Sequence, residues 1–142
     1  MKKTILSTIA ALMLITNMQA KQLDTELASE IEVAIQENKA ELPIKLNDIT
    51  EVSDITFNKN KEEMTTHIVI YADFDSQTVN SQSFKDILAS ESANIKKEAC
   101  ELELTQSLRE YENFKITYVY YSNKINSKNE IFRSTVYASS CN

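Results

Sequence analysis

The sequence predicts an α+β fold, in which about four strands form an antiparallel sheet of two hairpins with helices on one face. Hydrophobic residues recur at helical spacing in two separate segments, residues 23–41 and 81–112. Between and after these segments, alternating apolar and polar residues indicate two pairs of strands. The expected element order is α-β-β-α-α-β-β, and because single strands do not alternate with helices, no parallel pairing is expected.

The first element is expected to be an amphipathic helix of about four turns within residues 23–41. Asp24 is placed to cap its start. The helix should end before Pro43, because a residue that precedes proline is pushed out of the helical region. Its apolar side consists of Leu23, Leu27, Ile31, Ala34 and Ile35. Residues 42–50 should then run extended along the surface.

The first hairpin is expected at residues 51–74. A strand over residues 51–58 leads into a turn built from Asn and Lys in place of Gly, at residues 58–61. On the second strand, His67 falls on the side opposite the core. The side expected to face the core carries Met64, Thr66, Ile68, Ile70, Ala72 and Phe74.

The later elements are a long helix, a short helix and the second hairpin. Ser83 and Asp86 are spaced as a capping box at the start of the long helix. Its apolar stripe consists of Phe84, Ile87, Leu88, Ile95 and Ala99. The stripe changes phase near Cys100, which predicts a break and a second helix that ends near Glu112. Residues 114–121 and 130–140 are rich in β-branched and aromatic residues, which favours a hairpin.

The N-terminus has the pattern of a secretory signal peptide. Lys2 and Lys3 precede an apolar run over residues 5–15, and Ala20 supplies the small residue of a cleavage site. A retained membrane anchor is the alternative, but a spanning helix needs roughly 20 apolar residues and this run is too short. No cysteine lies at or just after the cleavage point for lipid attachment. We therefore expect residues 1–20 to be removed, which leaves residues 21–142 as a single α+β domain, periplasmic or secreted, without membrane insertion.

The composition excludes several functions. The net charge is −6, and loss of Lys2 and Lys3 with the signal peptide lowers it to −8. A surface this negative repels phosphate backbones, so no nucleic acid partner is expected. The chain has no Gly, which excludes a P-loop, a dinucleotide fingerprint and a nucleophile elbow. An AT-rich genome is an alternative explanation for the missing Gly.

Cys100 and Cys141 are the only cysteines. An even number of cysteines in an exported chain is typical of disulfides. A metal site and a redox pair are the alternatives, but zinc needs four ligands and redox pairs usually have CxxC spacing. We therefore predict a structural disulfide, which stabilises the fold by about 4 kcal/mol in the chain-entropy model. Neither a metal nor another cofactor is expected.

No catalytic set is evident in the sequence. His67 is the only imidazole, and no nucleophile is nominated beside it, so we interpret it as a half-exposed strand histidine. Residues 73–77 resemble the start of an EF-hand loop, but the central Gly is missing and Phe84 replaces the bidentate Glu. We therefore expect that the protein is not an enzyme, with a hydrolase as the remaining enzymatic alternative.

Tyrosines are concentrated on the predicted strands. Tyr offers a large amphipathic contact area, so these residues are candidates for a protein-binding surface. Cross-strand packing is the alternative that we favour, because aromatic residues pack in this way in most sheets. The five tyrosines concerned are Tyr71, Tyr118, Tyr120, Tyr121 and Tyr137.

Several features occur together in a recognisable order. They are Leu42-Pro43 with Asp48 and Thr50, a strand that ends at Tyr71, Cys100, the run Tyr118-Val119-Tyr120, and Cys141. In this pattern the chain resembles a largely uncharacterised group of small exported bacterial proteins. It departs from the group at Asn113, where a Gly often precedes the Tyr-x-Tyr strand, and in the absence of Gly from the last hairpin. The resemblance implies the same disulfide and α+β order, and it implies no activity.

These observations lead to two hypotheses about function. The first is a non-enzymatic periplasmic or secreted protein that binds another protein, as an accessory of the cell envelope or of secretion. The alternative is a small acidic inhibitor or immunity-type protein that neutralises a basic partner, which the charge of −8 motivates.

Overall fold

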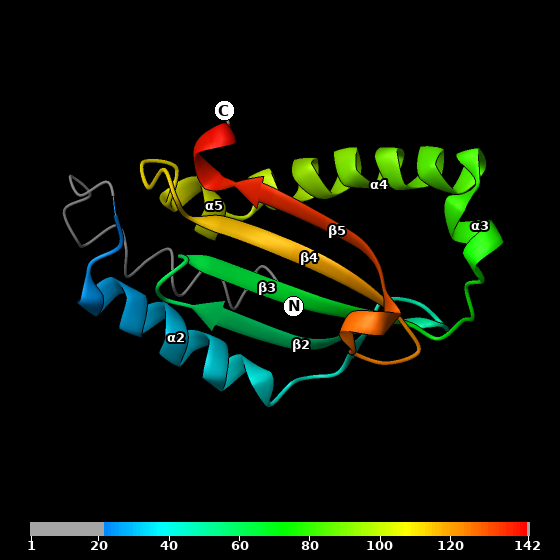
Figure 1. Cartoon of the computed structure of the whole chain (residues 1–142). Helices are drawn as coiled ribbons and strands as arrows, with labels where there is room; N and C mark the ends of the chain where they lie inside the picture. Colours follow the sequence, from blue (N-terminus) through cyan, green and yellow to red (C-terminus); the bar gives the residue numbers. More distant parts are fainter. Residues whose placement is uncertain (1–21, 142) are drawn as a thin grey trace.

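One sheet of five strands organises the computed structural model, which describes residues 22–141 (Figure 1). The strands are β1 (Ile44–Lys45), β2 (Thr50–Asn58), β3 (Glu63–Ile70), β4 (Lys115–Ser122) and β5 (Glu130–Tyr137), and they lie side by side in chain order. The helices are α2 (Thr25–Lys39), α3 (Ser76–Asn80), α4 (Gln82–Glu101) and α5 (Glu103–Ser107), with short 3₁₀ helices η1 (Ser127–Asn129) and η2 (Ala138–Ser140). The α+β class is confirmed. The expected signal peptide and its cleavage after Ala20 lie outside the described residues.

The prediction of a wholly antiparallel sheet was wrong at its centre. β3 and β4 pair in parallel, with Met64 opposite Ile116 and Ile68 opposite Tyr120. The cause is the connection between them, because α4 has 20 residues and is therefore about 30 Å long. It returns the chain along the sheet to the end where β3 began (Figure 1). The two expected hairpins, β2–β3 and β4–β5, are present and antiparallel.

The prediction of four strands was also wrong, because β1 pairs with β2 through Ile44 and Lys45. β1 lies in the segment that was expected to run extended along the surface. Two residues are too short for alternation of apolar and polar side chains to be visible in the sequence. A further short helix, α3, occupies the polar segment before α4 and is capped by Asp75, whose Oδ1 accepts the Thr78 N–H at 2.7 Å. The described order is therefore α-β-β-β-α-α-α-β-β.

Local chemistry explains where the longer helices begin and end. Asp24 caps α2 as predicted, and its Oδ1 accepts the Leu27 N–H at 2.7 Å. α4 is capped by Ser81, whose Oγ accepts the Phe84 N–H at 3.2 Å, so the expected capping box at Ser83 does not start the helix. The break near Cys100 is confirmed, since Leu102 has extended backbone between α4 and α5.

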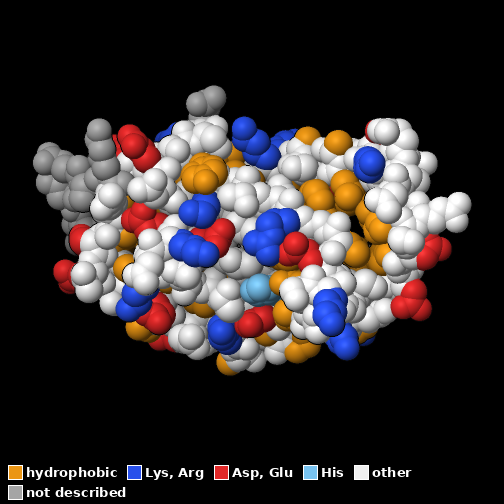
Figure 2. Space-filling view, viewed as in Figure 1, with side chains coloured by type: hydrophobic (Ala, Val, Ile, Leu, Met, Phe, Trp, Pro, Cys, Tyr) orange, Lys and Arg blue, Asp and Glu red, His pale blue; other side chains and the backbone are white. Residues whose placement is uncertain are grey.

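The helices α2, α4 and α5 pack on one face of the sheet, as predicted. α2 and α5 cover one part of this face in a cluster that includes Ile31, Leu104 and Ile116. α4 covers the part beside β5, in a cluster formed by Ile95, Ala99, Val136 and Cys141. Tyr118 contacts both clusters, which joins them. We call the opposite side of the sheet the open face; it carries His67 and its neighbours and is the side seen in Figures 1 and 2.

Candidate functional site

The predicted disulfide between Cys100 and Cys141 is present, with a Cα–Cα distance of 5.3 Å. Cys100 lies in the last turn of α4, and Cys141 follows η2. Cys141 is buried against Ile95, Ala99 and Val136. The bond therefore holds the C-terminal segment against the end of α4, within the core.

The five candidate tyrosines are divided between different parts of the molecule. Tyr118 and Tyr120 point to the face that the helices cover, and both contact the cluster under α4. Tyr121 lies on the open face, where its side chain is buried. Tyr71 and Tyr137 are exposed at opposite ends of the sheet, Tyr71 just after β3 and Tyr137 at the end of β5. The structure thus brings together Tyr118 and Tyr120 and does not gather the five hydroxyls on one surface.

Burial changes the acidity of the tyrosines under α4. Desolvation, together with the nearby carboxylates of Glu91 and Glu98, raises the pKa of Tyr120 to about 12. Desolvation also raises the pKa of Tyr118. Both hydroxyls therefore remain neutral at physiological pH.

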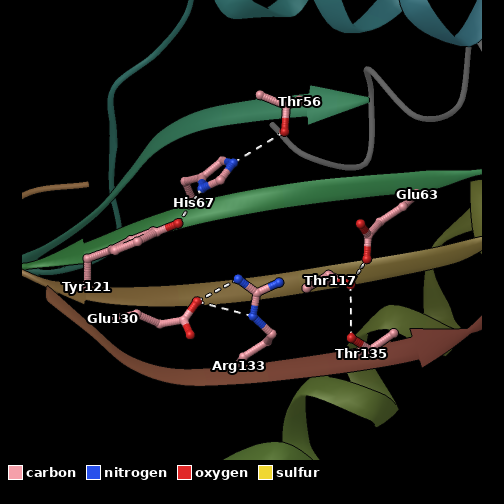
Figure 3. A network of polar contacts seen from close by, with 8 residues as sticks. All are labelled: Thr56, Glu63, His67, Thr117, Tyr121, Glu130, Arg133 and Thr135. Atoms are coloured by element: carbon pink, nitrogen blue, oxygen red, sulfur yellow. Dashed lines mark hydrogen bonds and ion pairs between the residues drawn. The ribbon is translucent and has the colours of Figure 1, made fainter. Parts of the chain in front are cut away.

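On the open face, His67 lies between two hydroxyl groups (Figure 3). Its Nδ1 is 2.9 Å from Tyr121 Oη, and its Nε2 is 3.2 Å from Thr56 Oγ1. The His67 and Tyr121 rings are stacked, with centroids 5.8 Å apart. Burial is the largest effect on the imidazole and lowers its pKa, although the Asp54 carboxylate acts in the opposite direction. The ring is therefore neutral at pH 7.

The contacts of His67 have the outline of a nucleophile, a base and an orienting group, formed by Thr56, His67 and Tyr121. Thr56 lies within β2 and is paired in register with Thr65 of β3. The group that contacts Nδ1 is the phenol of Tyr121, which lacks the negative charge with which a carboxylate stabilises an imidazolium.

Other polar side chains of the open face contact their cross-strand neighbours. Thr117 Oγ1 lies 2.8 Å from Glu63 Oε2 and 2.9 Å from Thr135 Oγ1. Arg133 and Glu130 form an ion pair of 2.6 Å on β5 (Figure 3). Figure 2 shows charged side chains of both signs distributed over this face. Mutual pairing of this kind is typical of a solvated sheet surface.

Residues 22–141 form neither a metal cluster nor a membrane-spanning helix. No group of three or more His, Cys, Asp or Glu side chains there is arranged to hold a metal ion. No helix in that part of the chain is long and apolar enough to cross a bilayer.

The most unusual surface lies on the N-terminal half of α4. Of the 20 residues of α4, Ile95 and Ala99 are the ones buried, and both belong to the C-terminal half. Toward the N-terminus, the apolar stripe continues through Phe84, Ile87 and Leu88, which we call the α4 strip. Ile87 is 64% exposed, and Phe84 and Leu88 are only half-buried.

A hollow lies near the start of α4, at one end of the sheet. Figure 2 shows apolar side chains gathered around this hollow, in the region where Figure 1 places α3, the start of α4 and the nearby end of the sheet. Two aromatic contacts belong to this region: Phe74 packs on Phe84, with ring centroids 5.8 Å apart, and Tyr120 packs on Phe132 at 5.6 Å.

The sequence did not reveal two of these features. The periodicity predicted one continuous buried stripe on α4, because spacing alone does not show where a helix leaves its sheet. The contact of His67 with Thr56 joins residues 11 positions apart. The turn at residues 58–62 was a signal that could have revealed it, since a hairpin closed at Asn58 and Glu63 places Thr56 beside the strand of His67.

No protein-family model matches the chain, and no curated protein matches it. Two solved structures are similar in fold. One is a protein of Pseudomonas aeruginosa described as secreted, with 20% sequence identity and a TM-score of 0.61, covering 89% of this chain and 100% of its own. The other is a pilotin of the type 2 secretion system from Vibrio vulnificus, with 15% identity and a TM-score of 0.48, covering 84% of this chain and 98% of its own. The likeness to the Pseudomonas protein shows that this arrangement of sheet and helices occurs in another protein of similar extent.

Proposed function

We propose that this chain is an exported, non-enzymatic protein that binds a segment of another protein, as an accessory of the cell envelope or of secretion. The α4 strip and the hollow near the start of α4 are the proposed binding site. The observation that carries this proposal is the exposure of Ile87, between the half-buried Phe84 and Leu88, on a helix whose other half is buried. Apolar surface that lies near a hollow is typical of sites that bind another molecule.

Anchoring of α4 supports the same site. Ser92 Oγ lies 3.1 Å from Ser134 Oγ of β5, and from there toward the C-terminus Ile95 and Ala99 are buried. The disulfide at Cys100 fixes the far end of the helix. The unburied half of α4 is therefore held in place by its other half, so a partner would meet a preformed surface and lose little entropy on binding.

Two carboxylates of α4 bear on the chemistry of the partner. Glu91 and Glu98 lie close enough to Tyr120 to raise its pKa. A segment that combines apolar side chains with Lys or Arg would match both the α4 strip and these carboxylates. We therefore propose that the partner segment is amphipathic and basic.

The non-enzymatic part of the proposal rests on the open face. His67 has a hydroxyl on each ring nitrogen, and the group on Nδ1 is a neutral phenol in place of the carboxylate that orients the base of a hydrolytic triad. Hydrolytic turnover by the purified protein that is abolished by His67→Ala would overturn this part.

The binding site is tested by photo-crosslinking in the native envelope fraction. A photoreactive benzophenone side chain is placed at position 87 of a tagged chain, and a matched control carries it at position 33. Val33 is an exposed apolar residue of α2, 57% exposed compared with 64% for Ile87. The proposal expects a discrete crosslinked protein from position 87 and none from position 33. Equal crosslinking from both positions, or none from either, would overturn it.

Substitution of Ile87 and the salt dependence of the complex distinguish the proposed binding protein from the alternative, an acidic inhibitor that neutralises a basic partner. Ile87→Asp should abolish capture of the crosslinked protein, while Val33→Asp should preserve it. A complex held by apolar contact persists at high salt, whereas one held by net charge is lost because salt screens the attraction between surface charges. Loss of the complex at high salt, with no effect of Ile87→Asp, would favour neutralisation of a basic partner.

A further inference from the structure

A second cavity lies at the other end of the sheet from the hollow. It has a volume of about 310 Å³ and is lined by the β2–β3 turn, the start of β4, the end of β5 and the residues that precede α2. This volume is near the lower limit of known small-molecule sites, roughly 300 Å³. The cavity is therefore large enough for a small metabolite-sized group.

The charge of this cavity is opposite to that of the whole chain. Its lining contains the three lysines Lys59, Lys61 and Lys115, and Glu62 is the acidic residue among the lining residues. The chain as a whole has 21 acidic and 15 basic residues. Ammonium groups concentrated in a cavity of an acidic protein create a local positive potential that attracts anions.

The lysines differ in how they are engaged. Lys59 forms an ion pair of 2.6 Å with Glu32 of α2. Lys115 stands opposite Glu63 in the strand register, yet its Nζ donates instead to the Lys61 carbonyl at 2.9 Å, on the cavity side. Lys61 makes no side-chain hydrogen bond or ion pair with a described residue, and the same holds for the amides of Asn60 and Asn113. The cavity therefore presents N–H donors that have no acceptor within residues 22–141.

The turn that presents these donors is held firmly. Glu62 adopts a left-handed backbone with a φ of 51° and is buried. Its carbonyl accepts the Lys115 N–H at 3.0 Å, and its Oε1 accepts the Leu23 N–H at 2.5 Å. The Glu62 carboxylate is thus directed to the backbone before α2, and the turn is fixed between two neighbouring segments. A fixed set of donors favours binding because little order is lost when the ligand arrives.

We propose that this cavity binds a small organic anion of sugar size through its phosphate or carboxylate group. Lys61 Nζ and Lys115 Nζ provide the charge, and the amides of Asn60 and Asn113 provide additional donors. The Tyr137 ring, which lies 5.6 Å from Lys115 Nζ, forms an aromatic wall for the body of the ligand. This site is independent of the α4 strip, so its test can fail without affecting the proposed function.

The test is titration of the purified, disulfide-intact protein with glucose 6-phosphate, glucuronate and glucose, at constant ionic strength, followed by backbone amide NMR. The proposal expects saturable shifts at residues 59–62, 113 and 115 with at least one of the two anions, and no shifts with glucose. The two anions distinguish phosphate from carboxylate as the recognised group. Absence of saturable shifts with both anions, or equal shifts with glucose, would overturn the proposal.

Substitution assigns the site to its lysines. Lys61→Gln should weaken anion binding about tenfold, because a charge-assisted hydrogen bond is lost. Lys96→Gln on α4 is the matched control, and it should leave the affinity unchanged. Lys61 makes no side-chain contact that the fold needs, so this variant is expected to fold. Equal affinities of the Lys61→Gln and Lys96→Gln proteins would overturn the assignment.

Discussion

His67 Nδ1 and Tyr121 Oη lie 2.9 Å apart, although the two residues are 54 positions apart in the sequence. His67 belongs to β3 and Tyr121 to β4, the pair of strands that runs in parallel. The chain makes this contact only after α3, α4 and α5 have returned it along the sheet. The contact therefore forms only when β3 and β4 are paired at the centre of the sheet. Protonation of the His67 imidazole should consequently be linked to the stability of the fold.

We expect stability to fall as the pH falls below 6.5. Burial lowers the pKa of His67 in the folded protein from its ordinary value of 6.5. In that pH range the unfolded chain binds the proton more readily, so unfolding becomes more favourable until the pH passes the folded pKa. His67→Gln removes the titrating group and should reduce this pH dependence. Urea unfolding of both proteins over a series of pH values measures it, and identical slopes would contradict the expectation.

The parallel pair also shows where prediction from sequence failed. Hydrophobic spacing identified the two hairpins and the long helix, because these depend on residues close together in the chain. The direction of β4 depends instead on how far α4 carries the chain back along the sheet. That length is visible in the sequence, but the face and path of the crossover are set by packing between Ile95, Val136 and Tyr118.

Shortening an apolar side chain should reduce stability more in the C-terminal half of α4 than in its N-terminal half. Ile95→Ala removes buried methyl groups and should lower the free energy of unfolding by about 2–5 kcal/mol. Ile87→Ala lies on the exposed α4 strip and should change it by about 0.5 kcal/mol or less. Chemical denaturation of the two variants measures both changes. A large loss for Ile87→Ala would show that the α4 strip is packed in solution.

Loss of the disulfide should destabilise the protein without changing its fold. The bond closes a loop over a sequence separation of 41, and the chain-entropy model gives about 4 kcal/mol for a loop of that length. Cys100→Ser combined with Cys141→Ser should therefore lower the free energy of unfolding by a similar amount. Wild-type protein in reductant is the matched comparison. If the wild type is equally stable with and without reductant, the bond contributes nothing to stability.

Tyr120 should make the fold sensitive to alkali. Burial raises its pKa to about 12 from an ordinary value of 10. Above pH 10 the unfolded chain loses the phenolic proton while the folded chain retains it, so stability should decrease as the pH rises through this range. Tyr120→Phe should decrease this loss of stability. Tyrosinate absorbance during alkaline titration measures the ionisation of the phenol. An unchanged titration curve above pH 10 would contradict burial of the hydroxyl.

For the candidate sites, the sequence supplied the residues but not their grouping. The disulfide was predictable because parity and export leave one pairing for Cys100 and Cys141. The lysines of the second cavity come from the β2–β3 turn and from β4, so only the parallel register of Glu63 with Lys115 brings them together. The exposure of Ile87 depends on the angle at which α4 leaves the sheet, which helical periodicity does not encode.

The sulfur bridge also converts part of the chain into a covalent ring. α5, β4 and β5 all lie between Cys100 and Cys141, so the ring encloses them. Residues 123–128, which connect β4 to β5, are exposed and are therefore accessible to a protease. A nick there would leave two polypeptides that migrate together on a gel until a thiol reagent separates them. A protein built in this way remains one covalent body after a single cut in that connection.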